Sequence, residues 1–305
     1  MKVAVIGIGS NSVRMLVAEV ENGEMRRIRR EREGTRLFAG LDAGRNLSAS
    51  AMETTCVAVK AMADSARAEG VDAIHLFATS ATRDAANQAD FSAMLLHHTG
   101  LELEICSGET EAALSFFGAT DGGDSGVIDI GGGSTEVIVG TGMDVRCGFS
   151  CQMGAVRLAG RMPIRDHGDL SSVQLVAADI LEEELRLHPA LTLPAAWRGT
   201  GGTFTTLAAI MKGIRWTDRT YMHGTVLTKA FVQRIARELS DMPIEERKLL
   251  PGLQPNRADI IVHGICILVA CMERMGIEEI TVSEYGNLDG YVKWHYLNSK
   301  AEAMC

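Results

Sequence analysis

The sequence predicts a duplicated α/β fold with a cleft between its two related halves. Apolar runs rich in β-branched residues alternate with helix-length stretches along the whole chain. An apolar run, a glycine turn and a second β-rich run occur within residues 2–18, and the same order returns within 126–139. With an offset of 122 residues, Gly7 aligns with Asp129 and Arg14 with Glu136. A whole supersecondary unit is therefore repeated, which is typical of a duplicated fold.

Periodicity and turn residues predict the other elements. Asn22-Gly23 is a type I′ hairpin signal between the strand at 13–18 and further strand within 24–38. The elements expected after it are a helix at 50–69, a strand at 73–78, a helix near 84–98, a strand at 101–106, a helix at 108–118, strands within 126–139 and near 143–150, a helix at 171–187, a helix at about 204–212, helices near 228–240 and 257–275, a strand at 278–283 and a last helix at about 288–298.

The chain contains no low-complexity linker, so we expect a tight crossing between two domains. The length of 305 residues also favours two domains. The first domain is expected to comprise 1–117 together with about 288–305, and the second to comprise 118–287.

Composition excludes several classes of protein. A net charge of −9 argues against a nucleic-acid or membrane-surface binder, because those proteins need a basic face. Arg14 and Glu19 interrupt the apolar N-terminus, and no stretch reaches the roughly 18 apolar residues of a membrane span. The seven cysteines have no disulfide spacing, which indicates a reducing compartment. We therefore expect a cytoplasmic protein, for which a homodimer is a plausible assembly, although the sequence does not determine the oligomeric state.

Three glycine turns occur in the sequence, at Gly9–Ser12, Gly131–Ser134 and Gly199–Thr203. The first two follow predicted strands, and the third leads directly into a predicted helix. Such turns bind phosphate well, because backbone N–H groups approach the oxygens closely where no Cβ intervenes. A dinucleotide-binding Rossmann turn is disfavoured, since Ser12 replaces the third glycine and a strand follows where that motif needs a helix. A Walker loop is excluded because no Gly-Lys-Ser/Thr follows any of the turns.

Several short motifs along the chain resemble, in order, those of the exopolyphosphatase and guanosine pentaphosphate phosphohydrolase (Ppx/GppA) family. They are Gly9-Ser10-Asn11-Ser12-x-Arg14, Ala78-Thr79-Ser80-Ala81-x-Arg83, Ser107-Gly108-x-x-Glu111-Ala112, Asp129-Ile130-Gly131-Gly132-Gly133-Ser134-Thr135-Glu136, Met153-Gly154-Ala155-Val156-Arg157-Leu158, Gly199-Thr200-Gly201-Gly202-Thr203, Arg257-Ala258-Asp259 and Ser283-Glu284-Tyr285-Gly286. The resemblance covers nearly the whole chain. It is to the short, two-domain form of this family within the actin, sugar-kinase and heat-shock ATPase superfamily.

The resemblance implies two actin-like (ribonuclease H-like) domains and a hydrolase that releases the terminal phosphate of inorganic polyphosphate or guanosine pentaphosphate. It assigns a divalent metal, Mg²⁺ or another cation, to Asp129 and Glu136, and it makes Glu111 the general base, with Arg83 as a second catalytic residue. The expected phosphate-binding residues are Gly9, Ser10, Asn11, Ser12, Arg14, Gly131, Gly132, Gly133, Ser134, Thr135, Arg157, Gly201, Gly202 and Thr203.

Structural interpretations of the same residues remain open. Asp129 is equally well a turn residue and Glu136 an exposed strand carboxylate. A carboxylate such as Glu111 in the first turn of a helix is also favoured by the helix dipole alone. Arg83 is expected to open a helix, where it could serve a structural salt bridge. Threonines in glycine turns often serve only as caps.

The basic run Arg26 to Arg32 has a structural explanation as well. Simple alternation places Arg27 and Arg29 on one face and Arg26 and Arg30 on the other, with glutamates between them. A solvated, protected edge strand is therefore expected rather than a polyanion track.

The sequence departs from the family pattern in its first loop, where Gly7 stands in place of an aspartate. Thr110 also replaces a glutamate that often precedes the proposed base, and Glu284 stands where an aspartate is common. These changes keep alternatives open. Short polyphosphate is the first expected substrate, guanosine pentaphosphate is the second, and a catalytically weak polyphosphate- or nucleotide-binding sensor is the alternative from another class.

Overall fold

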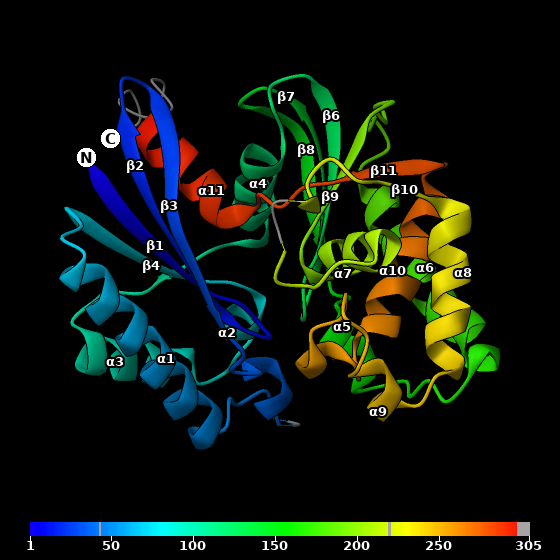
Figure 1. Ribbon diagram of the computed structural model, residues 1–305, viewed down its shortest axis with the longest axis horizontal. Helices are drawn as coiled ribbons and strands as arrows, with labels where there is room; N and C mark the ends of the chain where they lie inside the picture. The colour runs from blue at the N-terminus through cyan, green and yellow to red at the C-terminus, as the bar shows by residue number, and fades with distance from the viewer. Residues whose placement is uncertain (43, 219–220, 298–305) are drawn as a thin grey trace. The chain divides into compact units, whose positions relative to one another are not determined.

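The computed structural model describes residues 1–42, 44–218 and 221–297. The described chain forms two compact units (Figure 1). Unit 1 comprises Met1–Gly118 and the C-terminal segment that begins at Asn287, and unit 2 comprises Ala119–Gly286. The chain therefore leaves unit 1 once and returns to it once.

Unit 1 contains a five-stranded sheet in the order β3-β2-β1-β4-β5. β1 pairs with β2 antiparallel and with β4 parallel, and β4 pairs with β5 parallel. Its strands are β1 (Lys2–Ile8), β2 (Val13–Glu21), β3 (Glu24–Glu33), β4 (Ala73–Ala78) and β5 (Glu104–Ile105), and its helices are α1 (Ala49–Ala68), α2 (Ser80–Arg83), α3 (Gln88–Thr99), α4 (Gly108–Ala119) and α11 (Asn287–Val292), which continues as a π-helical turn at Lys293–Leu297; a short 3-10 turn lies at Leu37–Gly40.

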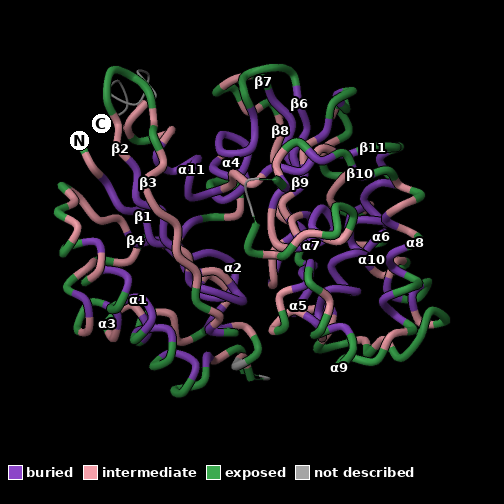
Figure 2. The backbone as a smooth tube through the Cα atoms, in the orientation of Figure 1, coloured by how far each residue is buried: buried purple, intermediate pink, exposed green. Residues whose placement is uncertain are grey.

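Helices cover both faces of the unit 1 sheet, and β1 is accordingly buried along almost its whole length (Figure 2). Ala4, Ile6 and Ile8 pack in one core with α1 and α3. Val3 and Val5 point the other way and pack in a second core with α4 and α11. This arrangement explains why β1 reads as a continuous apolar run, since strands buried on both faces lose the alternation of polar and apolar residues.

Unit 2 contains a six-stranded sheet in the order β10-β11-β9-β6-β7-β8. One large apolar core joins this sheet to the helices, among which α10 is buried over most of its length. The strands are β6 (Asp124–Ile130), β7 (Thr135–Thr141), β8 (Asp144–Cys151), β9 (Trp197–Thr200), β10 (Val226–Thr228) and β11 (Glu279–Val282), and the helices are α5 (Ala155–Ala159), α6 (Leu170–Leu187), α7 (Gly202–Lys212), α8 (Lys229–Asp241), α9 (Ile244–Arg247) and α10 (Ile261–Arg274), with short 3-10 turns at His167–Asp169 and Pro255–Arg257.

The two sheets share one topology, which confirms the predicted duplicated α/β fold. In each sheet a three-stranded antiparallel meander continues into two parallel strands, as β3-β2-β1-β4-β5 and as β8-β7-β6-β9-β11. The registers also correspond, because Gly7 pairs with Arg14 in the first hairpin and Asp129 pairs with Glu136 in the second. β10 is an addition to the unit 2 sheet that the sequence analysis did not predict.

Two of the predicted elements are wrong in detail. The helix expected near 84–98 divides into α2 and α3, so Arg83 ends a short helix instead of opening a long one. The strand expected within 24–38 ends at Glu33 and is followed by the 3-10 turn. In both places a helical turn of four residues begins within a few residues of the end of the strand, and periodicity over so few residues cannot reveal such a turn.

β3 is an edge strand, as the basic run indicated, but its alternation is interrupted. Val17 pairs with Arg29 and Ala18 with Arg27, so Ile28 is an extra residue in a β-bulge. Arg27 and Arg30 consequently contact the same partner, Asp289, whereas Arg29 contacts Glu69 on the other face. The expectation that Arg27 and Arg29 share a face is therefore wrong.

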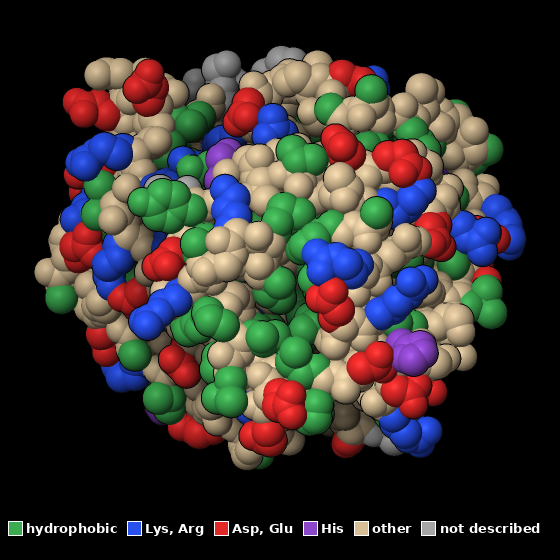
Figure 3. All heavy atoms as spheres, turned by 45° about the vertical axis from the view of Figure 1, so that its right-hand side comes forward, with side chains coloured by type: hydrophobic (Ala, Val, Ile, Leu, Met, Phe, Trp, Pro, Cys, Tyr) green, Lys and Arg blue, Asp and Glu red, His purple; other side chains and the backbone are tan. Residues whose placement is uncertain are grey.

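Charged side chains of both signs are interspersed on the face drawn in Figure 3, without a large basic patch on that face. None of the helices within the described ranges combines the length and the hydropathy that crossing a membrane requires.

His263 is a buried titratable side chain in α10. Only 4% of it is exposed, and its Nε2–H donates to the carbonyl oxygen of Met162 at 2.7 Å. Among residues 1–42, 44–218 and 221–297, no group bonds to its Nδ1. Burial lowers the pKa of His263, and the nearby Arg247 lowers it further. The imidazole is therefore neutral in the folded protein, with the proton on Nε2.

We expect the His263→Gln variant to lose part of the acid sensitivity of the fold. A histidine whose folded pKa is depressed stabilises the fold above its unfolded pKa of about 6.5, and this contribution is lost as pH falls toward the folded value. When thermal unfolding is measured between about pH 7.5 and about pH 5, the Tm of the wild type should fall more steeply than the Tm of the variant. At neutral pH the free energy of unfolding of the variant should be about 1 kcal/mol lower than that of the wild type, because the amide packs less well than the imidazole. If Tm falls equally with pH in both proteins, the neutral state assigned to His263 would be contradicted.

Candidate functional site

Three segments of unit 1 meet at one edge of its sheet, because β1, β4 and β5 are parallel and end there. They are the turn 9–12, the segment 79–83 and the segment 106–111. The Ser10 and Ser80 hydroxyls are hydrogen-bonded at 2.9 Å, which joins the first segment to the second. Arg83 Nη1 donates to the carbonyl oxygen of Cys106 at 3.0 Å, which joins the second segment to the third.

The first glycine turn directs backbone N–H groups away from the protein. Its Ser10 and Asn11 carbonyl oxygens accept hydrogen bonds from the N–H groups of Phe38 and Arg36. In a trans peptide the N–H points opposite to the C=O, and the described chain has no cis peptide. The N–H groups of Asn11 and Ser12 therefore face the other side, where no described residue accepts them.

Asn11 adds an unsatisfied side chain to this turn. The residue is only 8% exposed, and neither Oδ1 nor Nδ2 of its amide has a hydrogen-bond partner within the described chain. Buried amides are rarely left unpaired, since an unmade hydrogen bond costs about 1–3 kcal/mol. The arrangement indicates a place for a polar ligand beside the turn.

Glu111 and Arg83, the two predicted catalytic residues, form an ion pair. Arg83 Nη1 lies 3.0 Å from Glu111 Oε2, and the side chains are 19% and 9% exposed. Glu111 lies in the first turn of α4, and Arg83 lies at the end of α2. Arg83 Nη2 has no described partner, so one side of the guanidinium remains available to an anion. Burial raises the pKa of the neighbouring Cys106 thiol to about 12, which excludes it as a thiolate nucleophile at neutral pH.

Arg14 lies opposite Gly7 in the first hairpin and donates from Nη2 to Asn287 Oδ1 at 3.1 Å. No carboxylate of the described chain lies within ion-pair distance of Arg14. A Cβ placed on Gly7 would lie 3.0 Å from Leu288 Cδ2 and 3.0 Å from Phe77 Cζ. An apolar wall therefore occupies the space next to the position where the family carries an aspartate.

In unit 2, Asp129 and Glu136 face each other across the β6–β7 hairpin. Directly opposed residues leave the same face of a sheet with their Cβ atoms about 5 Å apart. Glu136 is 1% exposed and accepts a hydrogen bond from the Ser150 hydroxyl at 2.7 Å. The expectation that Glu136 could be an exposed strand carboxylate is therefore wrong, and the two acids share one face.

The carbonyl oxygens of the second glycine turn accept hydrogen bonds from the start of α5, as those of the first turn accept them from Arg36 and Phe38. The Gly131 carbonyl oxygen accepts from the Ala155 N–H, and that of Gly132 accepts from two N–H groups of the same helix. A Cβ on Gly154 would lie 2.4 Å from the Gly132 backbone, so the contact requires glycine. The N–H groups of Gly132 and Gly133 consequently point away from α5, with no described acceptor.

Arg157 holds this same turn, since its Nε donates to the Gly133 carbonyl oxygen at 2.6 Å. The predicted contact of Arg157 to phosphate stays a prediction. The structure shows in addition that Arg157 holds the peptide of Gly133 in place. The turn is closed by a hydrogen bond from the Gly131 N–H to the Ser134 carbonyl oxygen at 3.0 Å. In unit 1 the Gly9 N–H donates to the Ser12 carbonyl oxygen in the same way, also at 3.0 Å.

The third glycine turn touches the acidic pair of unit 2. Gly201 has a φ of +98°, and a Cβ there would lie 2.9 Å from Asp129 Oδ1. A Cβ on Gly202 would overlap the guanidinium of Arg257. Arg257 therefore belongs to the site, although the sequence analysis gave its motif no role. The available signal was Gly202, the third glycine of the turn, which leaves room for a side chain from elsewhere.

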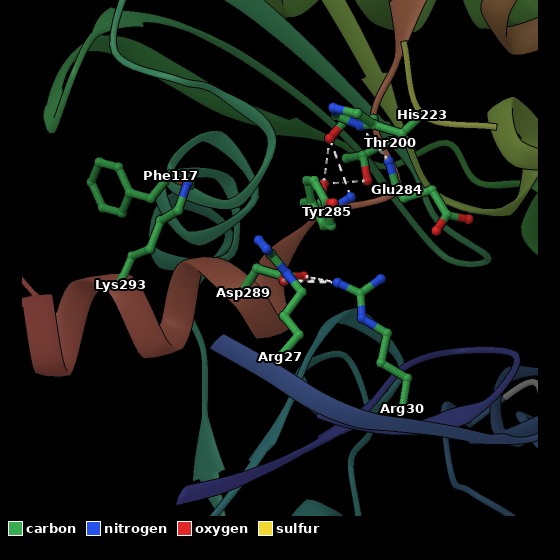
Figure 4. A network of polar contacts seen from close by, with 10 residues as sticks. Arg27, Arg30, Phe117, Thr200, His223, Glu284, Tyr285, Asp289 and Lys293 are labelled. Carbon is green, nitrogen blue, oxygen red and sulfur yellow. Dashed lines mark hydrogen bonds and ion pairs between the residues drawn. The ribbon is translucent and has the colours of Figure 1, made fainter. Parts of the chain in front are cut away.

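The hydroxyls of three threonines in these turns bond to protein or pack against it. Thr135 Oγ1 donates to the Met153 carbonyl oxygen at 2.6 Å, and Thr200 Oγ1 donates to that of Tyr285 at 3.1 Å (Figure 4). Thr203 Oγ1 lies 2.3 Å from the Cβ position of Gly264 in α10. The Thr135 hydroxyl proton is therefore already used by the protein, and the predicted contacts of Thr135 and Thr203 to phosphate stay predictions.

The donor set of unit 2 fits a hard divalent cation. Asp129 and Glu136 supply carboxylate oxygens on one face, and a Cβ at Gly201 would fill the space beside Asp129. Within the described ranges no three His, Cys, Asp or Glu side chains cluster as metal ligands. Two carboxylates suit Mg²⁺, which commonly takes one or two of them and completes its shell with water and phosphate oxygens.

Known proteins are similar to this chain in sequence and in fold. A model of the Ppx/GppA phosphatase family matches residues 16–295. Exopolyphosphatase 2 of Mycobacterium tuberculosis is 34% identical over 310 residues, covering 95% of this chain and 97% of that protein. The crystal structure of the Aquifex aeolicus Ppx/GppA family member has a TM-score of 0.81 at 28% identity, covering 97% of this chain and 98% of that one.

An exopolyphosphatase from Cytophaga hutchinsonii has the same fold, with a TM-score of 0.86 at 23% identity and coverage of 98% of this chain and 99% of that one. The family model, the relative and the shared fold agree with the motifs on the glycine turns. The chain therefore belongs to the Ppx/GppA phosphatase family.

Proposed function

We propose that the protein is a metal-dependent phosphohydrolase that releases the terminal phosphate of inorganic polyphosphate. The observation that carries this proposal is the common design of the turns at 9–12 and 131–134. In both turns the carbonyl oxygens are tied back and consecutive N–H groups are left for an anion. N–H groups arranged in this way bind phosphate oxygens regardless of what is attached to the phosphate.

Unit 1 supplies the group that activates water. The water oxygen attacks the terminal phosphorus, the bridging P–O bond breaks, and the shortened chain leaves with its electron pair. The Glu111 carboxylate accepts the proton that the water loses. Its bond from Arg83 fixes the orientation of the carboxylate, and Arg83 Nη2 is left for a phosphate oxygen.

Unit 2 supplies the acidic pair. Asp129 and Glu136 would hold the cation, and Ser150 and Gly201 fix or accommodate these carboxylates. When bound, a divalent cation supplies positive charge that stabilises the negative charge on the phosphate oxygens. Arg14, which has no carboxylate partner in the described chain, is a further candidate for the substrate's charge.

Substrate choice within the family is the second part of the proposal. Two of the similar proteins are named exopolyphosphatases, which supports inorganic polyphosphate as the substrate of this protein. We propose that the preferred polyphosphate chains are short. Guanosine pentaphosphate is the alternative substrate, and a weakly catalytic sensor is the alternative function. The apolar wall beside Gly7 favours the sensor only if the acidic pair of unit 2 fails to hold the cation alone.

We expect Glu111→Gln to abolish metal-dependent phosphate release from short polyphosphate, with a fall in kcat of about 10²- to 10⁴-fold. The amide keeps the shape of the side chain but accepts no proton. Glu109→Gln, which changes an exposed carboxylate in the same helical turn, is the matched control and should retain full activity. The measurement is phosphate release with Mg²⁺ and with chelator.

The same assay with guanosine pentaphosphate separates the two substrates through the ratio of their kcat/KM values. Undiminished release by Glu111→Gln would remove this residue as the base. Retained polyphosphate binding without release by the wild type would favour the sensor.

We expect Asp129→Asn to weaken Mg²⁺ binding by more than about tenfold, because loss of a direct ligand costs at least as much as loss of a supporting hydrogen bond. Asp124→Asn, at the exposed start of the same strand, removes a carboxylate paired with Arg146 and is the control. The measurements are calorimetric titration with the cation and the Mg²⁺ concentration that gives half-maximal phosphate release. Equal affinities in the two variants would exclude Asp129 as a ligand.

A further inference from the structure

Asp289 is a buried carboxylate that the proposed chemistry does not use. It lies in α11, with its side chain 4% exposed, and two arginines of β3 point at it (Figure 4). Arg27 Nε lies 2.5 Å from Asp289 Oδ1, and Arg30 Nη2 lies 2.7 Å from Oδ1 and 2.8 Å from Oδ2. Charge-assisted bonds from two directions fix both the place and the rotation of α11 on the unit 1 sheet.

The residue after Asp289 brings α11 into backbone contact with α4. A Cβ on Gly290 would lie 1.7 Å from the Leu114 carbonyl oxygen and 3.0 Å from the Gly118 nitrogen. Only glycine allows this approach, so the two helices touch without an intervening side chain. One turn further along, Lys293 Nζ donates to the Phe117 carbonyl oxygen at 2.7 Å (Figure 4). Trp294 also stacks on Phe117.

α4 is the helix that carries Glu111, and Leu114 lies three residues after Glu111. A helix transmits a shift of its middle to its first turn, because its backbone hydrogen bonds make it stiff over this length. Arg83 holds Glu111 from one side, and the contact with Gly290 fixes the helix beneath it. The position of Glu111 therefore depends on where α11 lies.

α4 and α11 also lie at the two places where the chain passes between the units. Unit 1 ends at Gly118, close to the end of α4, and resumes at Asn287, which is the first residue of α11. Both helices thus adjoin the peptide segments that connect to unit 2. Asn287 is also held, through its bond from Arg14.

We propose that Asp289 is a positioning residue for Glu111, acting through Gly290 and the α11–α4 backbone contact. The proposal rests on the proposed function, in which Glu111 is the base. Asp289 touches neither substrate nor metal in this proposal. It sets the distance and direction of the base, and small misplacements of a catalytic group cost about 10- to 100-fold in rate.

The experiment compares Asp289→Asn with the wild type in phosphate release from short polyphosphate. We expect kcat to fall about 10- to 100-fold while KM stays within about twofold, because substrate contacts are unchanged. Asp64→Asn is the matched control, since Asp64 is an exposed carboxylate of the same unit paired with two cations on α1. This control should have wild-type kinetics.

A double variant separates positioning from general stability. In the Glu111→Gln background, Asp289→Asn should cause no further loss of kcat, because the base that it positions is already gone. Equal losses in both backgrounds would overturn the proposal, and so would an unchanged kcat of the single variant. Asp289→Glu, which retains the charge, should recover part of the lost rate.

A measurement without turnover keeps the test independent of the proposed function. Hydrogen exchange of the backbone amides at 111–115 should be faster in Asp289→Asn than in the wild type, while exchange in α1 stays unchanged. If the wild type releases no phosphate from either substrate, the proposed function fails, and exchange alone decides whether Asp289 braces α4. Unchanged exchange at 111–115 would overturn the brace. Should Asp289→Asn not fold, Arg30→Gln serves in its place, because it removes the two bonds from Arg30 to Asp289 while Asp289 itself is retained.

Discussion

The two glycine turns at the ends of β1 and β6 depend on one constraint, which is that their carbonyl oxygens are already used. Backbone N–H groups of Arg36 and Phe38 bind the first turn, and the start of α5 binds the second. Because peptide planes are rigid, fixing the carbonyls fixes the N–H groups on the opposite side. The neighbouring segments, the close approach at Gly154 and the pairing of the hairpins all serve to hold these planes. The anion binding that we propose for these two turns therefore depends on the backbone before any charged side chain contributes.

The hairpins β1–β2 and β6–β7 have the same register but carry opposite charge at one pair of matching positions. At matching positions of the two hairpins, unit 1 has Gly7 opposite Arg14, and unit 2 has Asp129 opposite Glu136. An acidic pair attracts a cation, whereas a lone guanidinium attracts an anion. Leu288 and Phe77 fill the space beside Gly7, so the first half has replaced a carboxylate with packed apolar surface. Charge is thus divided between the halves although their topology is shared.

Local signals in the sequence predicted most of the fold and the family. The repeat, the Asn22-Gly23 turn and the long helices follow from spacing alone, and the structure confirms them. The glycine motifs predicted the correct family, while the roles of individual site residues stay predictions. What the sequence could not predict depends on tertiary contacts. The bulge at Ile28 arises from pairing with β2, and the contact of Arg27 and Arg30 with Asp289 joins residues about 260 positions apart. Arg257 entered the site only because Gly202 leaves it room.

The discontinuity of unit 1 has a consequence for biosynthesis. Unit 2 is one continuous stretch, so all of its residues have been made before the ribosome reaches Asn287. The apolar face of the first sheet that Leu288, Tyr291 and Val292 cover must stay open until then. During synthesis the nascent chain therefore carries an exposed hydrophobic surface for most of its length, which is the kind of surface that chaperones bind. When α11 packs onto this face, it covers the apolar surface and ends this period of exposure.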